Sequence, residues 1–205
     1  MKEFVRKHWA MIINIVLVLA LGRYAFVKAW DAWEANEFNF VEAAFAIHNI
    51  IMLTLILIRK QHVSIDHNIF NQLIALAAFF SGILFQKHPA ENLQSTSEVI
   101  MVISTILGII TLINLGRSFG ILIAVRQVKT SGLYRIIRHP MYFTDILWRI
   151  GYLVGNFYWL NSFIFFASSA CYVYRALLEE KFLSRFEEYQ EYKKKVHYRF
   201  LPGIY

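Results

Sequence analysis

The stretch from residue 132 to residue 142 carries the charged side chains best placed to bind a ligand. Arg138 and His139 directly precede Pro140, and proline is favoured in the first turn of a helix because its missing N–H would be unpaired there. Arg138 and His139 would then stand at a helix N-terminus, where free N–H groups favour anions. The stretch predicts a site for a ligand carboxylate. The alternative is that Arg138 is an orientation signal and His139 a simple N-cap.

A second group of charges, Arg175, Glu179 and Glu180, follows a long apolar run. Arg175 and Glu179 are one helical turn apart and can share a helix face. The carboxylates would bind hydroxyl or ammonium groups of a ligand, and the arginine would bind an acidic substrate group. The competing interpretation, which these residues alone favour, is an arginine that extends to the membrane surface and forms an ion pair there.

Other polar residues in the apolar runs have simpler interpretations. Asp145 and Arg149 are spaced for an i,i+4 pair inside a helix bundle, which we favour over a ligand contact for Asp145. His48 is isolated, which is more typical of a hydrogen-bonded interior histidine than of a ligand. The 7 histidines lack spacings such as H-E-x-x-H, and the single cysteine, Cys171, cannot build a thiolate site. The sequence therefore predicts no metal centre, and without a G-x-G-x-x-G run it predicts no Rossmann-type site.

Long apolar segments must position these charges. Of the 205 residues 58% are hydrophobic, and no charged residue occurs over 69–86, 99–116 or 150–174. Runs of at least about 18 such residues can cross the hydrocarbon layer of a bilayer, roughly 30 Å thick, as helices. Two shorter candidates are 9–22 and 43–58, so we expect several crossings.

The distribution of lysine and arginine sets the expected orientation. Basic residues concentrate in the N-terminal tail and in the links 59–68 and 117–139, which the positive-inside rule places in the cytoplasm. Residues 140–156 and 157–177 would form a helical hairpin that returns the chain to that side. We expect an all-α integral membrane protein with about six membrane helices and both termini cytoplasmic, which in a prokaryote would place it in the inner membrane. The formal charge of +7 then reports orientation and not nucleic-acid binding.

The C-terminal segment carries one apolar stripe. Its members recur at steps of three and four residues: Phe182, Phe186, Tyr189, Tyr192 and Val196. Acidic and basic residues fill the other faces. We therefore expect a cytosolic amphipathic helix that lies on the membrane surface or closes over a pocket.

Taken in order, these residues resemble the isoprenylcysteine carboxyl methyltransferase family, especially its short prokaryotic members. The resemblance covers about residues 112–205. It is carried by Thr130–Tyr134, Arg138–Tyr142, Glu179-Glu180, and the closing residues Glu188, Tyr189, Tyr192, Val196, Arg199 and Pro202. We expect a single membrane domain over 1–205, with N-terminal spans in 1–98 and the methyltransferase-like part in 99–205.

The resemblance implies a pocket for S-adenosylmethionine in the C-terminal half, open to the cytosol. The implied cofactor contacts are Val128, Lys129, Tyr134, His139, Pro140, Met141, Tyr142 and either Glu179 or Glu180. The sequence does not decide which of the two glutamates contacts the cofactor. The Phe-Gly-acidic-Glu-Tyr run of the family corresponds here to residues 186–189, which lack its glycine, and this leaves the alignment uncertain by one residue. Arg175 is the residue implied to orient the methyl acceptor.

The resemblance also implies the reaction. The acceptor would be a lipophilic small molecule or a lipidated substrate, such as a prenylcysteine-like carboxylate, that is surrounded by membrane lipid. Methyl transfer from a sulfonium is an in-line displacement, and a carboxylate acceptor is already ionised at neutral pH. No general base is then required, so alignment and exclusion of water would supply the catalysis.

Two other functions remain open. An NADPH-dependent membrane reductase of the sterol-reductase type has a similar C-terminal architecture, but it calls for asparagine before the tyrosine, where this chain has Met141 before Tyr142. A non-catalytic membrane protein that binds lipid or a partner would bind no nucleotide, and a shared fold does not guarantee a shared function.

Overall fold

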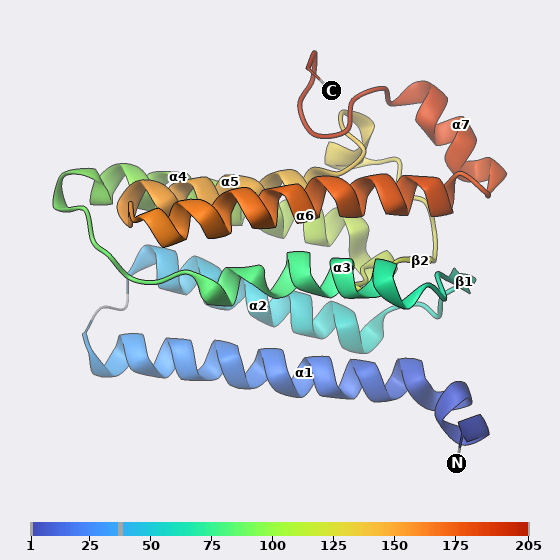
Figure 1. The fold of residues 1–205 in the computed structure, drawn as a ribbon, viewed down its shortest axis with the longest axis horizontal. Helices are drawn as coiled ribbons and strands as arrows, with labels where there is room; N and C mark the ends of the chain where they lie inside the picture. The colour runs from blue at the N-terminus through green and yellow to red at the C-terminus, as the bar shows by residue number, and fades with distance from the viewer. Residues whose placement is uncertain (1, 37–38, 205) are drawn as a thin grey trace.

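The computed structural model describes residues 2–36 and 39–204. Six long helices lie side by side with their axes in nearly the same direction, and a short seventh helix lies across one end (Figure 1). The helices are α1 (Lys2–Glu34), α2 (Phe40–Ile58), α3 (Ile69–Phe80), α4 (Gln94–Leu115), α5 (Pro140–Gly155), α6 (Trp159–Leu183) and α7 (Glu187–Lys195). Four 3-10 turns and two short strands complete the described elements: η1 (Ser81–Leu84), η2 (Glu91–Leu93), η3 (Gly116–Ser118), η4 (Gly132–Arg135), β1 (Ser64–Ile65) and β2 (Ala124–Val125).

The tightest packing in the bundle joins α4 to α5. A Cβ atom on Gly151 of α5 would stand 2.8 Å from Cγ of Met101 on α4, so only glycine allows this approach. The hydroxyl of Ser97 donates a hydrogen bond of 2.7 Å to the Gly151 carbonyl across the same contact. Small residues commonly bring helices together in membranes in this way, because van der Waals contact and interhelical hydrogen bonds replace the hydrophobic effect there.

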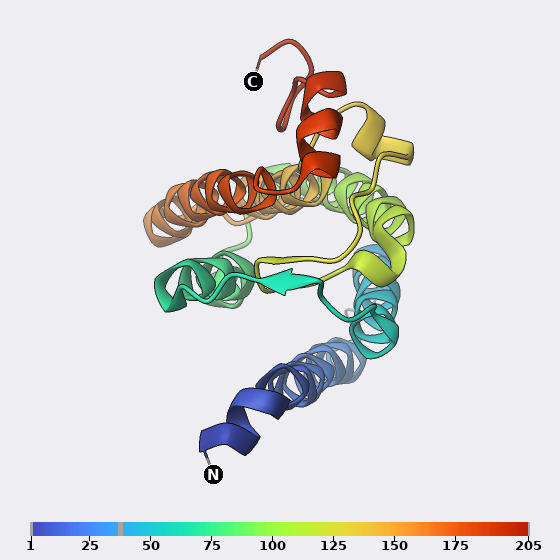
Figure 2. The same cartoon turned by 90° about the vertical axis from the view of Figure 1, so that its right-hand side faces the viewer.

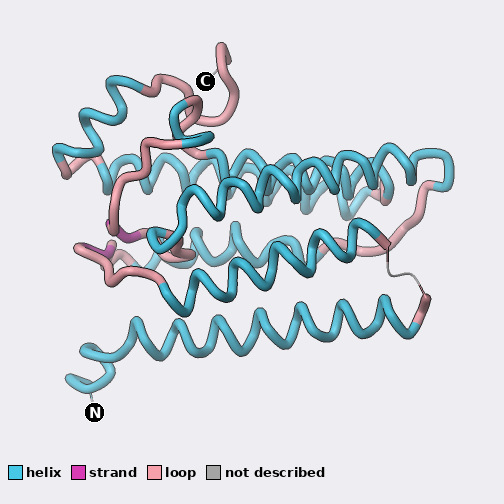
Figure 3. The backbone as a smooth tube through the Cα atoms, turned by 180° about the vertical axis from the view of Figure 1, so that it is seen from behind, coloured by secondary structure: helices cyan, strands magenta, loops and turns pink. Residues whose placement is uncertain are grey.

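The remaining helices extend this pair. α6 packs on α5 and on α3, while α2 packs on α4 and α1 covers α2. Viewed along the bundle (Figure 2), β1 crosses one end between α3 on one side and α2 and α4 on the other. β1 and β2 pair antiparallel at this end, and the start of α1 and all of α7 lie there too (Figures 1 and 3). We call this the loop-rich end.

The expected fold class is confirmed in its coarse form, because the described chain is mostly helical. Two described helices are long and apolar enough to cross a membrane, Phe40–Ile58 with a mean hydropathy of 2.1 and Gln94–Ser118 with 2.3. The hairpin forms as α5 and α6, which turn at Gly155 and Asn156. The count of six spans stays a prediction.

The C-terminal amphipathic helix is shorter than expected. Phe182 belongs to α6, and the chain turns before α7 begins at Glu187. The turn is held by backbone hydrogen bonds from Arg185 to the Phe182 carbonyl and from Phe186 to the Leu183 carbonyl. The apolar stripe is therefore divided between two helices that meet at an angle.

Candidate functional site

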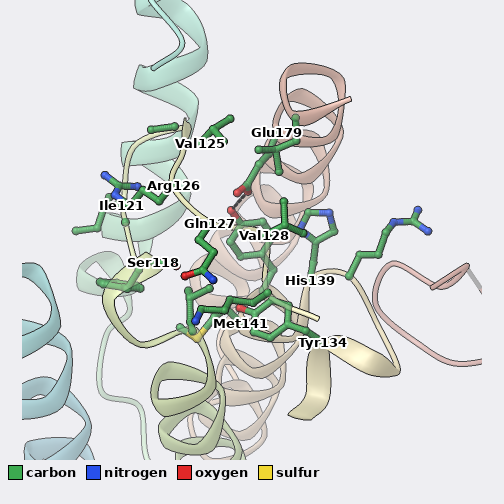
Figure 4. A pocket seen from close by; sticks show the side chains of 18 of the residues that line it. Ser118, Ile121, Val125, Arg126, Gln127, Val128, Tyr134, His139, Met141 and Glu179 are labelled. Carbon is green, nitrogen blue, oxygen red and sulfur yellow. Dashed lines mark hydrogen bonds between the residues drawn. The ribbon is translucent and has the colours of Figure 1, made fainter. Parts of the chain in front are cut away.

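A cavity opens at the loop-rich end, between the ends of the helices and the segment from residue 118 to residue 129. Figure 4 shows Tyr134, His139, Met141 and Glu179 around one space, with Arg126 and its neighbours across from them. Of the ten residues that the resemblance implies as cofactor or acceptor contacts, eight line the cavity: Val128, Lys129, Tyr134, His139, Met141, Tyr142, Arg175 and Glu179. Pro140 and Glu180 lie behind the wall and are not among the lining residues.

The segment from residue 118 to residue 129 forms one wall and is fixed by side chains from two helices. Gln72 of α3 binds the Ile123 backbone twice, accepting from its N–H at 2.9 Å and donating to its carbonyl at 3.1 Å. Arg175 of α6 donates to the Ile121 carbonyl at 2.5 Å. An extended segment cannot satisfy its own backbone groups, so these buried bonds determine where it lies.

The opposite wall is formed by η4 and the start of α5. Gly132 has φ +59°, and a Cβ there would collide with the Asn114 side chain at 2.1 Å, so the turn requires glycine. Pro140 occupies the first turn of α5, as the sequence predicts. The Tyr192 hydroxyl of α7 donates to the Tyr134 carbonyl at 2.7 Å. α7 thus closes over this part of the cavity, one of the two positions expected for it.

Glu180 is the centre of a buried ion-pair network behind the cavity. Its carboxylate accepts from Nε of Arg138 at 2.7 Å and from Nε of Arg199 at 3.1 Å, and it lies 3.1 Å from Nε2 of His139. Arg138 also donates to the carbonyls of Val196 and His197, at 2.7 and 2.6 Å. The network therefore ties the end of α6 to the start of α5 and to the C-terminal tail.

This network provides a partner within the protein for the charged side chains of the Arg138–His139 turn. Glu180 stands in the last turn of α6, beyond the apolar run 157–177. Burial alone would raise the pKa of its carboxyl, but hydrogen bonds and charge from His139 and Arg138 outweigh burial and lower the pKa to about 2. The anion expected beside these two residues is thus the protein's own carboxylate.

Glu179 is placed differently from Glu180. Its side chain lines the cavity and accepts a short hydrogen bond from the Tyr142 hydroxyl. The Tyr142 ring in turn stacks on His139, with ring centres 5.2 Å apart. Of the two glutamates, Glu179 is the one that a ligand in the cavity would meet.

Arg175 is 4% exposed and also lies in the cavity wall. Besides its bond to Ile121, it donates to the Ala75 carbonyl at 3.1 Å, and its guanidinium lies 4.9 Å from the centre of the Tyr142 ring. Its Nε has no hydrogen-bond partner among the described residues. The arginine therefore joins α6 to α3 and to the cavity wall, and its Nε–H donor is not used by the described residues.

The expected pair of Asp145 and Arg149 takes another form. Arg149 donates to the backbone carbonyl of Asp145 at 3.0 Å and to the Ser81 hydroxyl at 3.1 Å. Its guanidinium lies 4.8 Å from the centre of the Tyr172 ring. The Asp145 side chain instead lines the cavity.

Several lining residues were not identified from the sequence. They are His48, Ser118, Arg126 and Gln127. Arg126 and Gln127 directly precede Val128, so neighbouring position was a usable signal for them. No sequence signal identifies His48 or Ser118, because only helix packing brings them to the cavity. Within residues 2–36 and 39–204, no three His, Cys, Asp or Glu side chains group as metal ligands.

Comparison with known proteins gives a consistent result. Residues 98–185 match the model of the isoprenylcysteine carboxyl methyltransferase (ICMT) family. Two relatives from Oryza sativa, subspecies indica and japonica, are each described as a probable protein-S-isoprenylcysteine O-methyltransferase. Each is 31% identical over 107 residues, which cover 48% of this chain and 56% of the relative. The chain thus spans about half the length of the curated relatives it matches.

Proposed function

We propose that this chain is an integral membrane methyltransferase of the isoprenylcysteine carboxyl methyltransferase family and that it uses S-adenosylmethionine; the match of residues 98–185 to the model of that family supports this proposal. One observation carries the proposal. Tyr134, His139 and Tyr142 line the same cavity as Glu179, although about 40 positions separate them in the sequence. These are the residues that the family resemblance assigns to the cofactor.

The cavity wall suits an adenosyl ligand with both apolar and polar parts. Val128 and Met141 offer apolar surface, and the Glu179 carboxylate has lone pairs left to accept from hydroxyl or ammonium groups. Tyr142 holds that carboxylate in place through its hydroxyl. Pro140 and Glu180 would act from behind the wall, by fixing the start of α5 and the side chain of His139. The cofactor supplies the methyl group, and the protein supplies alignment.

Exposed apolar surface supports a multi-pass membrane protein. Only 28% of the most apolar window in α2, and the same share in α4, is buried within the protein. Large hydrophobic side chains on α1 and α6 are also exposed, among them Leu19, Trp33, Phe163 and Phe166. Lipid would cover these faces, because soluble proteins rarely expose continuous apolar surface of this extent.

The orientation follows from the basic links. The 59–68 and 117–139 links lie at the loop-rich end, which we assign to the cytoplasm together with the start of α1 and α7. Residues 159–177 of α6 would then lie in the bilayer, with Glu179 and Glu180 at the cytoplasmic surface. The cavity would admit a soluble cofactor from the cytosol.

Arg175 is our candidate for orienting the acceptor. A prenylcysteine-like carboxylate would be attracted to the guanidinium, whose Nε is not used within the described protein. Its bonds to Ala75 and Ile121 would hold it in one direction. Catalysis would then come from alignment of the acceptor with the methyl group in a site that excludes water.

Binding of S-adenosylhomocysteine to the purified protein, measured by isothermal titration calorimetry, tests the cofactor assignment. We expect saturable binding of S-adenosylhomocysteine and none of NADPH. Binding of NADPH alone would favour the reductase, and binding of neither ligand would favour a non-catalytic protein.

Arg175→Ala then tests the acceptor assignment. It should lower the use of a prenylcysteine-type acceptor far more than it lowers affinity for S-adenosylhomocysteine. Arg185→Ala, on the α6–α7 turn, is the matched control. Equal losses of acceptor use and cofactor affinity in Arg175→Ala would refute the assigned role.

A further inference from the structure

The turn that the sequence predicts as a carboxylate site already holds a carboxylate of the protein. Glu180 lies 2.7 Å from Nε of Arg138 and 3.1 Å from Nε2 of His139. A ligand carboxylate beside this network would meet cations whose charge Glu180 already balances, and it would be repelled by that glutamate. The amino-acid end of a bound cofactor therefore needs a different cation in the cavity wall.

Arg126 lines the cavity from the wall that lies across from the motif residues (Figure 4). It follows β2 directly, and its Nε donates to the carbonyl of Lys60 at 3.2 Å. Among the described residues this is the one hydrogen bond that Arg126 forms. The N–H donors of its two terminal nitrogens are therefore available to a ligand.

Gly120 makes room for the guanidinium group of Arg126. A Cβ atom on Gly120 would stand 2.3 Å from Nη1, 2.8 Å from Cζ and 3.0 Å from Nη2 of the arginine. These distances are shorter than van der Waals contact, so a side chain at this position would displace the guanidinium. The glycine and the Lys60 carbonyl together hold the charge in one place. A guanidinium that is already held loses less conformational entropy when it binds an anion.

Glu179 provides the opposite charge in the same cavity. Burial lowers the pKa of Arg126, and the Glu179 carboxylate acts on that pKa in the opposite direction. The guanidinium stays charged at neutral pH, as arginine does in proteins. Among the described residues these two groups form no ion pair with each other. A cation and an anion that line one cavity without pairing suit a ligand group that carries both charges.

We infer that Arg126 binds the carboxylate of the cofactor while Glu179 accepts from its ammonium group, so that the two residues hold the amino-acid end of the adenosyl ligand between them. The inference rests on the proposed function and concerns how the same cavity recognises its cofactor. Guanidinium groups offer parallel N–H donors that match the two oxygens of a carboxylate. Arg126 would therefore select ligands with an amino-acid end over nucleosides that lack one.

The other cations of the cavity wall are less suitable for this role. Both terminal nitrogens of Arg175 already donate, one to the Ala75 carbonyl and the other to the Ile121 carbonyl. Lys129 lines the cavity, but no hydrogen bond within the described residues holds its ammonium group, which stands on a flexible four-carbon stem. Arg126 combines a fixed position with two unused terminal nitrogens.

The test measures two ligands on wild type and Arg126→Gln by isothermal titration calorimetry in detergent. The ligands are S-adenosylhomocysteine and decarboxylated S-adenosylhomocysteine, which keeps the ammonium group. The variant should bind S-adenosylhomocysteine roughly 10- to 100-fold more weakly than wild type does, the value of a hydrogen bond between charged groups. It should bind the decarboxylated ligand at least as tightly as wild type does, because that cationic ligand offers Arg126 no anion.

Arg117→Gln is the matched control. Arg117 is exposed at the same end of the bundle, and its Nε donates to the Ile58 carbonyl at 2.9 Å, but it does not line the cavity. This variant should keep the wild-type affinity for both ligands.

Two results would overturn the inference. Equal weakening of both ligands in Arg126→Gln would show that the arginine only shapes the cavity wall, and unchanged affinity for S-adenosylhomocysteine would show that it meets no carboxylate. A wild-type protein that binds neither ligand would instead overturn the proposed function. If Arg126→Gln does not fold, Gly120→Ala decides, because the added methyl group displaces the guanidinium and keeps its charge. Weaker binding of S-adenosylhomocysteine alone supports the inference, and an equal effect on both ligands, or none, rejects it.

Discussion

Replacing Glu180 with glutamine should remove a large part of the stability of the loop-rich end. The carboxylate is 3% exposed and bound by Arg138, His139 and Arg199. Its pKa falls from the ordinary 4.5 to about 2, and each unit corresponds to about 1.4 kcal/mol, so the ionised carboxylate contributes about 3 kcal/mol. Breaking a buried ion pair by removing one partner costs roughly 3–5 kcal/mol, which agrees. For a protein of this size we expect Tm to fall by about 6–12 °C.

The sign of the pH dependence follows from the direction of the shift. Because the pKa of Glu180 is lower in the folded protein, its contribution is complete above about pH 5 and is lost as pH falls from about 4.5 toward 2. Over that pH window the free energy of unfolding of the wild type should therefore fall by about 3 kcal/mol more than that of Glu180→Gln. The two Tm values should converge in acid.

The assay is thermal unfolding in detergent micelles, followed by intrinsic fluorescence between pH 2 and pH 8. Glu188→Gln, an exposed glutamate on α7, is the matched control and should keep the wild-type profile. Parallel wild-type and Glu180→Gln curves over the whole range would refute the reasoning. A Tm of Glu180→Gln at pH 7 within about 2 °C of the wild-type value would also refute it, because Glu180 would then contribute about 1 kcal/mol or less to the free energy of unfolding.

Two further substitutions test other parts of the structure. Tyr142→Phe removes the hydroxyl that holds Glu179 and should weaken S-adenosylhomocysteine binding by about tenfold in calorimetry, the value of about one hydrogen bond to a charged group; unchanged affinity would count against Glu179 as a cofactor contact. Gly151→Leu forces a side chain into Met101 and should cost roughly 1–3 kcal/mol in thermal unfolding. Ile150→Leu, on the neighbouring exposed position, should leave Tm unchanged.

Hydrophobic periodicity made the helices accessible to prediction. The run 43–58 appears within α2, all but the last residue of the run 99–116 lies within α4, and the two arms of the hairpin form α5 and α6. A helix satisfies its backbone groups within itself, so apolar length and helix-starting residues such as Pro140 are sufficient to locate it. The boundary before α7 was missed because it depends on local turn bonds that apolar spacing does not encode.

The residues of the candidate site could be predicted in part from the sequence. The family resemblance implied ten contact residues, of which eight line one cavity, and Tyr142 and Glu179 among them are in direct contact. The motifs left open which glutamate faces the cavity, because adjacent residues on a helix differ by about 100° in direction and only packing against a neighbour fixes which one points inward. The structure turns Glu180 toward Arg138 and leaves Glu179 at the cavity.

The sequence by itself determined the helical elements, the likeness to a methyltransferase family and the set of residues from which the site is drawn. Tertiary structure decided how those charges are paired, that Arg126 lines the same cavity as Glu179, and that Gln72 fixes the wall opposite the motifs. The physical reason is the separation along the chain of the residues that each kind of interaction joins. Helix formation depends on residues within a turn or two, whereas ion pairs and cavities depend on groups far apart in the chain that only helix packing brings together.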